Sequence, residues 1–208
     1  MAEPQVNELI VRGIVVGVFA ENCWIIGSRR TGEAVVIDPG DQPQEILALA
    51  RDMGVRIKLI ANSHGHVDHV LGVRGVQAAT GARFLLHPLD LPVLRGAATR
   101  LPWSGPVEPP PDPDAFLSDG DEVEVAGVKL KVMHTPGHTQ GSVSFYSEGM
   151  LFCGDTLFQG SIGRTDFPGG SHEQEMASIV DRLLTLPDDT IVLPGHMGET
   201  RIGIERQI

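Results

Sequence analysis

The stretch Ser63–His69 (Ser-His-Gly-His-Val-Asp-His) constrains the chain most strongly, because five of its seven residues can bind a metal or accept a proton. It follows a strand-like run over 56–61 and precedes an amphipathic run with valines three residues apart at 70, 73 and 76. This order predicts a loop between a strand and a helix. Loops at strand ends are where functional residues usually lie, so we expect a site here.

The spacing within the stretch favours two neighbouring metal sites. If the chain is extended at His64 and His66, their side chains point to the same side and both imidazoles can bind one ion. Asp68 and His69 come after the chain has begun to turn, so they can reach an adjacent position. The alternative is a polar turn with surface histidines, which suits a single histidine far better than this concentration of ligands.

Three further residues, His138, Asp155 and His196, share one context, a strand end beside a glycine. Before His138, Pro136 ends the strand and Gly137 permits a sharp turn. Four residues cannot complete two metal sites, so other ligands must come from elsewhere in the chain. These three could converge on one rim of a sheet.

Together with Asp38, at the end of the strand-like run 33–38, these residues resemble the pattern of the metallo-β-lactamase superfamily, and within it the small glyoxalase II-like hydrolases. The resemblance covers nearly the whole chain. It implies seven ligands for two divalent ions, with zinc expected and iron or manganese as alternatives. They are His64, His66 and His138 for one ion, Asp68, His69 and His196 for the other, and Asp155 between them. For Asp38 it implies a carboxylate that orients the metal loop, whereas the simpler interpretation is an Asx turn.

Strand and helix patterns occur in both halves of the chain. The expected strands are 9–19, 22–28, 33–38, 57–61, 83–87, 121–126, 128–134, 141–147, 150–154 and 190–193. The expected helices are one begun by a capping box of Asp41 and Gln44, one from the metal loop to about 79, one over 89–99, and one begun by a capping box of Ser171 and Gln174. Two strand-rich halves with helices predict an α+β fold of two facing sheets, and the resemblance implies the same four-layer αββα sandwich.

A proline-rich segment, 102–114, separates the two halves. Its six prolines forbid regular structure and predict an extended loop. A linker between two domains is the alternative, but each half holds part of the metal set. We therefore expect residues 1–208 to form a single metallo-hydrolase domain, in line with the chain's length.

The charge balance limits the classes of partner that the protein can bind, and the cysteines indicate its compartment. With 27 acidic and 16 basic residues, the net charge of −11 disfavours binding to nucleic acid or to an anionic membrane and leaves a small-molecule substrate. The run 9–20 resembles a signal peptide, but Glu3 and Glu8 stand where basic residues should be, so a strand is favoured. Cys23 and Cys153 lie in apolar runs and predict no disulfide, which suits the cytoplasm.

A glycine-rich loop, 160–170, follows Asp155 and contains one arginine, Arg164. Such loops are often only connections, but this position makes Arg164 a candidate to bind a substrate carboxylate through its planar guanidinium. His87, His134 and His172 are expected to be structural or exposed. Cys153 could be a nucleophile, but its apolar strand favours a packing role.

The resemblance implies hydrolysis by a hydroxide held between two metals, with Asp68 orienting it. No further carboxylate is evident as a general acid, and a thiolate can leave without one. A thioester such as S-lactoylglutathione is therefore expected rather than an amide. Full-length glyoxalase II enzymes bind glutathione with a C-terminal helical domain, but only twelve residues follow His196, which predicts a short-form hydrolase with a more open pocket.

The main alternative is an oxidoreductase. Persulfide dioxygenases share the fold, resemble the chain at Gly163–Phe167, and use one iron held by two histidines and a carboxylate, here His64, His138 and Asp155. A nuclease of the same superfamily is disfavoured by the acidic balance. Two zinc ions per chain would favour hydrolysis, and one iron would favour the dioxygenase.

Overall fold

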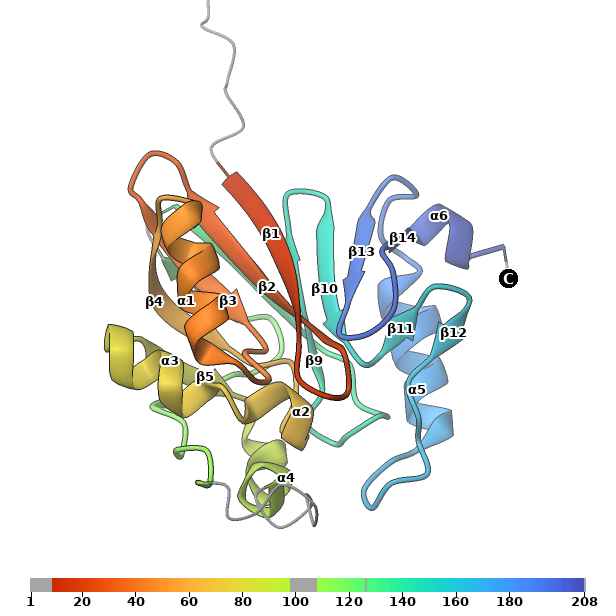
Figure 1. Ribbon diagram of the computed structural model, residues 1–208. Coiled ribbons are helices and arrows are strands. Elements are labelled where there is room, and N and C mark those ends of the chain that lie inside the picture. Colours follow the sequence, from red (N-terminus) through yellow and green to blue (C-terminus); the bar gives the residue numbers. More distant parts are fainter. Residues whose placement is uncertain (1–8, 98–107, 126, 208) are drawn as a thin grey trace, which may run out of the picture.

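Two six-stranded sheets form the centre of the computed structural model, which describes residues 9–97, 108–125 and 127–207 (Figure 1). The first sheet contains β1 to β6 in sequence order. Their bounds are Leu9–Val16, Glu21–Ser28, Glu33–Ile37, Arg56–Ala61, Arg83–Leu86 and Ala115–Phe116. The sheet is antiparallel through β3 and parallel from β3 to β6, so β3 and β4 end at the same edge.

The second sheet has the order β14-β13-β10-β9-β8-β7. These strands span Glu122–Val125 (β7), Val128–His134 (β8), Val143–Ser147 (β9), Met150–Gly154 (β10), Ile191–Pro194 (β13) and Thr200–Arg201 (β14). A small hairpin of β11 (Leu157–Phe158) and β12 (Ser161–Ile162) follows β10. Because β10 and β13 are parallel neighbours, residues that follow them lie side by side.

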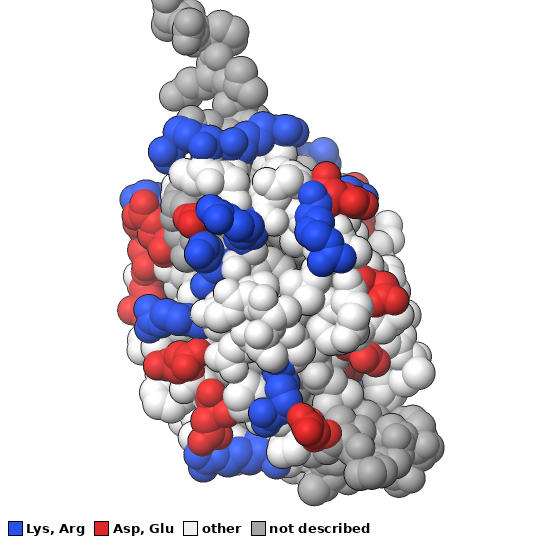
Figure 2. All heavy atoms as spheres, turned by 60° about the vertical axis from the view of Figure 1, so that its left-hand side comes forward, with Lys and Arg blue, Asp and Glu red and all other residues white. Residues whose placement is uncertain are grey.

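The helices lie outside the sheets (Figure 1). They are α1 (Pro43–Asp52), α2 (Val67–Val70), α3 (Val73–Thr80), α4 (Leu91–Gly96), α5 (His172–Ser178) and α6 (Ile202–Glu205), with a 3-10 turn η1 (Pro88–Asp90) and a π-helical turn η3 (Ile179–Leu183). None of the helices in the described residues has the length and apolar character needed to cross a membrane. Figure 2 shows a row of basic side chains along the top of one face, acidic and basic side chains around its margins, and an uncharged surface at its centre.

Three separate hydrophobic clusters establish the four layers. One joins α1 and α3 to the first sheet, one lies between the sheets, and one joins α5 and η3 to the second sheet. Successive side chains of a strand point to opposite faces. Ile25 accordingly packs under the helices and Ile26 between the sheets, whereas Val132 lies between the sheets and Met133 under η3. The expected αββα sandwich is confirmed.

Helix ends differ from the expectations in three places. Asp41 and Gln44 form no capping box, because Gln42 with φ 48° is the N-cap, Pro43 begins the helix, and Asp41 accepts from the adjacent Gln42 N–H instead. The helix expected from the metal loop to about 79 is divided at Gly72, whose N–H donates to Pro39 rather than continuing the first turn. At the last helix Ser171 Oγ accepts from the Gln174 N–H, but Ser171 N donates to the Gly137 carbonyl, so the capping box is not completed, and a π-helical turn replaces the second half of the helix.

Several strands are shorter than expected, and some elements had no sequence signal. The first strand ends at Val16, because Gly17 adopts φ 66° and starts a hairpin turn. The helix expected over 89–99 is the turn η1 followed by α4, and residues 98 and 99 lie outside the described part. The two-residue strands β6, β11, β12 and β14 and the short α6 were not expected. In the proline-rich segment, 102–107 lie outside the described residues and 108–114 contain no helix or strand.

Candidate metal centre

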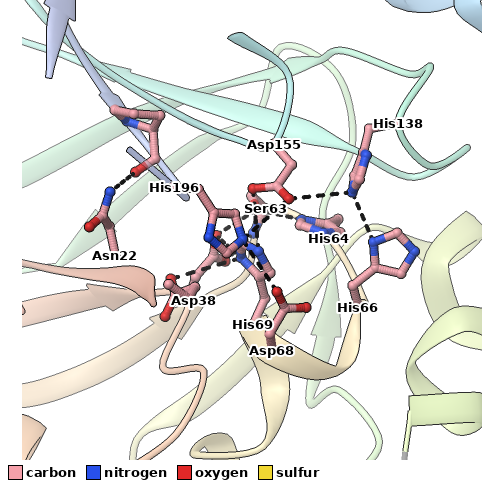
Figure 3. A network of polar contacts seen from close by, with 12 residues as sticks. Asn22, Asp38, Ser63, His64, His66, Asp68, His69, His138, Asp155 and His196 are labelled. Carbon is pink, nitrogen blue, oxygen red and sulfur yellow. Dashed lines mark hydrogen bonds and ion pairs between the residues drawn. The ribbon is translucent and has the colours of Figure 1, made fainter. Parts of the chain in front are cut away.

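All seven expected ligands meet at one end of the two sheets (Figure 3). The loop after β4 carries His64 and His66, and the adjoining α2 carries Asp68 and His69. The second sheet supplies the others after β8, β10 and β13: His138, Asp155 and His196. The complete ligand set therefore forms only when both sheets have packed together.

The ligand atoms form two groups. Those of His64, His66 and His138 lie within 4.8 Å of one another, as do those of Asp68, His69 and His196. A third group of the same kind, Asp38, His64 and His69, overlaps both. The first two groups are the ligand sets that the resemblance implies.

Asp155 lies between the two groups. Its Oδ2 is 3.6 Å from His138 Nε2 and 3.5 Å from His196 Nε2, and its Oδ1 is 3.4 Å from His69 Nε2. One carboxylate thus faces histidines of both groups, the position required of a bridging ligand. On the other side of the second group, His196 Nε2 lies 3.2 Å from Asp68 Oδ2.

The polar atoms at the centre fit divalent ions. His64 Nε2, His69 Nε2 and Asp155 Oδ1 are buried without a hydrogen-bond partner, although buried polar atoms are normally paired. His66 Nδ1 and His138 Nε2 face each other at 2.8 Å. Because His138 Nδ1 donates to the carbonyl of Arg164 at 2.7 Å, its Nε2 presents a lone pair toward the centre. Nitrogen and carboxylate ligands in this arrangement suit zinc and also iron.

The electrostatics favour the metal-binding forms of His64, His66 and Asp155, whereas nearby carboxylates outweigh burial and raise the pKa of His69 and His196. Burial, reinforced by the neighbouring imidazoles His69 and His138, lowers the pKa of His64, and burial with His138 lowers the pKa of His66 to about 3. Both imidazoles are therefore neutral at physiological pH. Burial raises the pKa of Asp155, but the opposing effect of His69, His138 and His196 is larger and leaves that pKa below its ordinary value. The carboxylate stays ionised, as a metal ligand requires.

Asp38 holds the metal loop from below. The carboxylate is buried and accepts from Ser63 N and Ser63 Oγ at 2.6 Å and from His69 Nδ1 at 3.0 Å. Ser63 Oγ in turn lies 2.9 Å from His64 Nδ1. These contacts fix the ring orientations and leave both Nε2 atoms directed at the centre. The contacts match the orienting carboxylate that the resemblance implies, rather than a simple turn.

Three buried carboxylates at the site were not predicted from the sequence. Asp90, which is 0% exposed, accepts from Gly65 N at 2.7 Å, Gly141 N at 2.7 Å and Thr139 Oγ1 at 2.9 Å, and so joins the loop of His64 to the loop of His138. No motif surrounds Asp90 in the sequence.

The other two carboxylates each lie next to one ligand. Glu175 accepts from the backbone N–H of His138 at 2.7 Å, and burial raises its pKa to about 8. Glu21 is fully buried, 3.9 Å from His69 Nδ1, with neither carboxylate oxygen hydrogen-bonded. The sole sequence signal for Glu21 and Glu175 is an acidic residue within an apolar run or within the first turn of a helix.

A cavity of about 500 Å³ opens onto the centre. It is lined by the ligands that face outward and by Phe19, Val67, Phe158, Arg164 and Phe167. Arg164 is thus placed beside the site, but its guanidinium makes a bidentate pair with Asp166 at 2.9 and 2.8 Å and lies 4.3 Å over the ring of Phe167.

The remaining candidates lie away from the chemistry. His87 and His134 stack on each other with ring centroids 4.4 Å apart, and His172 is exposed at the start of α5. Cys153 is buried, its Sγ donates to the carbonyl of Leu157, and burial raises its pKa to about 12, so it is no nucleophile.

A sandwich of two sheets with a histidine and carboxylate centre at one end defines a metal-dependent enzyme fold. The family model for the metallo-beta-lactamase superfamily matches residues 16–196. The chain belongs to this superfamily.

Related sequences and solved structures also place the chain in this superfamily. A protein of Aquifex aeolicus, described as uncharacterized, is 40% identical, with 95% of this chain and 94% of that protein aligned. The hydroxyacylglutathione hydrolase GloC of Haemophilus influenzae is 32% identical, with 93% of each chain aligned.

Among solved structures, the B3 metallo-beta-lactamase BLEG-1 has a TM-score of 0.87 at 34% identity, covering 96% of this chain and 97% of that one. TTHA1623 in a di-iron-bound form has a TM-score of 0.85 at 37% identity, covering 94% and 97%. ETHE1 from Myxococcus xanthus has a TM-score of 0.81 at 28% identity, covering 95% and 82%.

Proposed function

We propose that this protein is a binuclear metal-dependent hydrolase that cleaves a thioester such as S-lactoylglutathione. The observation that carries the proposal is Asp155, one carboxylate that faces histidines of both ligand groups. A mononuclear centre would leave His69 and His196 without a ligand role. The similarity to a protein named as a hydroxyacylglutathione hydrolase supports the choice of a thioester.

Two divalent ions bound here would make hydroxide available near neutral pH and polarise a carbonyl oxygen. The side chains of the pocket would do the rest. Asp68 lines the cavity beside His196, so its carboxylate can accept a hydrogen bond from the attacking hydroxide and hold its direction. The ring orientations set by Asp38 and Ser63 keep the centre in place during attack.

The acidic side chains in the cavity limit which leaving group the site can release. The carboxylates that line the cavity are Asp68 and Asp155, and both are metal ligands in this proposal. Asp166, nearby, is paired with Arg164. No carboxylic acid among the described lining residues is therefore free to protonate an amine, whereas a thiolate leaves unprotonated. This supports a thioester rather than an amide.

A mononuclear iron oxidoreductase, resembling the persulfide dioxygenases, is the second candidate. It would use His64, His138 and Asp155, which the structure brings together. The similarity to ETHE1 and the di-iron form of TTHA1623 favour testing iron as well as zinc.

Metal analysis after dialysis tests both proposals. We expect about two ions per chain in the wild type and about one in His69→Ala, because His69 belongs to the second group. S-lactoylglutathione, a β-lactam and glutathione persulfide would then be compared as substrates. One iron per chain that His69→Ala retains, with oxygen consumption on the persulfide and no thioester cleavage, would replace the hydrolase by the oxidoreductase.

A further inference from the structure

Phenylalanine side chains stand at both ends of the metal centre. The ring of Phe167 lies 5.2 Å from the ring of His66 and 6.2 Å from that of His138, both in the first ligand group. The ring of Phe158 lies 6.2 Å from the ring of His196, in the second group. Phe19, on the β1–β2 hairpin, also lines the cavity.

These rings gain less from burial than the phenylalanines of the core. Three of the seven phenylalanines, Phe84, Phe145 and Phe152, are fully buried in the core, as the hydrophobic effect favours. The three at the cavity are all partly exposed, Phe19 to 44%. Several large apolar side chains around one concave site are typical of a ligand pocket.

The cavity offers little to an anionic group. Among the described lining residues Arg164 is the single Lys or Arg, and its Nε and Nη2 donate to Asp166. The thiol half of a glutathione thioester carries two carboxylates. One of them could displace Asp166, and apart from the metal ions themselves the other would meet no cation there. The net charge of −11 adds a general repulsion.

We propose that the preferred substrate is a thioester whose acyl and thiol substituents are uncharged and apolar, with one substituent against Phe167 and the other against Phe158. The inference rests on the proposed hydrolase function and narrows its substrate class. S-lactoylglutathione is then cleaved more slowly than such a thioester, because its thiol half is charged and polar. A cavity of about 500 Å³ is large enough for a phenyl-sized group on each side of the reacting carbonyl.

Two thioesters with the same acyl group test the proposal. S-benzyl thioacetate and S-acetylglutathione both release an alkanethiol, so their intrinsic reactivities are similar. We expect kcat/KM to be at least about tenfold higher for the benzyl thioester. Phe158→Ala or Phe167→Ala should lower kcat/KM on the benzyl thioester about tenfold and leave S-acetylglutathione nearly unchanged.

The matched control is Phe116→Ala, which removes a ring that is 52% exposed on β6, outside the cavity, and should alter neither reaction. Metal content of each variant is measured beside the kinetics. A preference for S-acetylglutathione, or equal losses on both substrates in the cavity variants, would overturn the inference.

Binding without turnover separates this inference from the proposed function. Benzyl ethyl sulfide and S-ethylglutathione, which cannot be hydrolysed, are titrated into the metal-loaded protein by calorimetry. Tighter binding of the sulfide that is lost in Phe158→Ala or Phe167→Ala, with neither thioester cleaved, would uphold the apolar pocket and refute the thioesterase. Cleavage of both thioesters with no preference in rate or binding would do the reverse.

Discussion

At the residue scale, the centre depends on how each imidazole uses its second nitrogen. His64, His69 and His138 each direct one ring nitrogen to a neighbour, namely Ser63 Oγ, Asp38 Oδ2 and the carbonyl of Arg164. The Nε2 atoms of His64 and His69 have no hydrogen-bond partner, and His138 Nε2 faces His66 Nδ1 at 2.8 Å, so all three are available to a cation at the centre. A side chain that orients a ligand ring can therefore affect metal binding even though it does not bind the ion itself.

Arg164 has to exchange partners before it can bind a substrate carboxylate. Its side chain is 66% exposed and paired with Asp166, so Arg164→Ala should raise KM for charged thioesters by no more than about fivefold. Asp166→Asn should act in the opposite direction, because it frees the guanidinium. Steady-state kinetics on S-acetylglutathione and S-benzyl thioacetate would check this. Equal changes on both substrates would show that Arg164 supports Phe167 or the loop instead.

His87 should make the fold more sensitive to acid. Burial, with a smaller contribution from His134, lowers its pKa from 6.5 to about 4. Between those two values the unfolded chain binds more protons than the folded one, so stability falls as pH falls from about 6.5 to about 4. His87→Asn keeps an acceptor for the Leu89 N–H and removes the titration.

The variant should lose less of its unfolding temperature between pH 7 and pH 5 than the wild type does. Thermal unfolding followed by circular dichroism measures this difference. His172→Asn, at an exposed position, is the control and should behave like the wild type. An unchanged pH dependence in His87→Asn would rule out this source of acid sensitivity.

At the scale of elements, the loops that bear ligands are joined to one another as well as to their strands. Asp90, at the end of η1, connects the loop after β4 to the loop after β8. Its approach is so close that a Cβ on Gly65 would meet the Asp90 carbonyl at 2.9 Å, and one on Gly141 would meet Asp90 Oδ1 at 2.6 Å. Glycine at both positions is therefore a requirement of this contact.

Asp90→Asn should weaken metal binding by the first ligand group by about 10- to 100-fold, because an amide cannot accept all three hydrogen bonds. The group is His64, His66 and His138, and competition with a chelator measures its affinity. Asp114→Asn is a matched control, since Asp114 also accepts a backbone N–H, that of Phe84 at 2.8 Å, away from the centre. Full metal affinity in Asp90→Asn would show that the loops hold their positions without this carboxylate.

At the scale of the whole molecule, the metal centre and the sheet packing depend on each other. The first sheet and its loops provide four ligands, and the second sheet provides His138, Asp155 and His196. The N–H of Asn22 donates to the carbonyl of Gly195, and Trp24 Nε1 donates to that of Pro194, so the strands are also joined next to His196. Ions bound here would hold the two halves together.

Metal removal should therefore lower the unfolding temperature. At a free concentration one hundred times Kd, one ion contributes about 2.7 kcal/mol to stability. For a chain of this size that corresponds to about 5–10 °C per ion. Calorimetry before and after chelation checks this, with His69→Ala expected to show about half the shift. A temperature that chelation leaves unchanged would mean that the ions do not link the halves.

Local sequence determined the ligand positions and the layers of this protein. Strands buried on both faces and glycines at strand ends are encoded over a few residues, so the sandwich and the sequence of His64, His66, Asp68 and His69 could be predicted from the chain. Only the tertiary structure revealed Asp90, Glu21 and the phenylalanine pair at the cavity. The contacts of these residues join segments far apart in sequence, for example 51 residues apart for Asp90 and Gly141. No local pattern records such a contact, because the free energy that selects it comes from packing two sheets, and not from the propensity of any one segment.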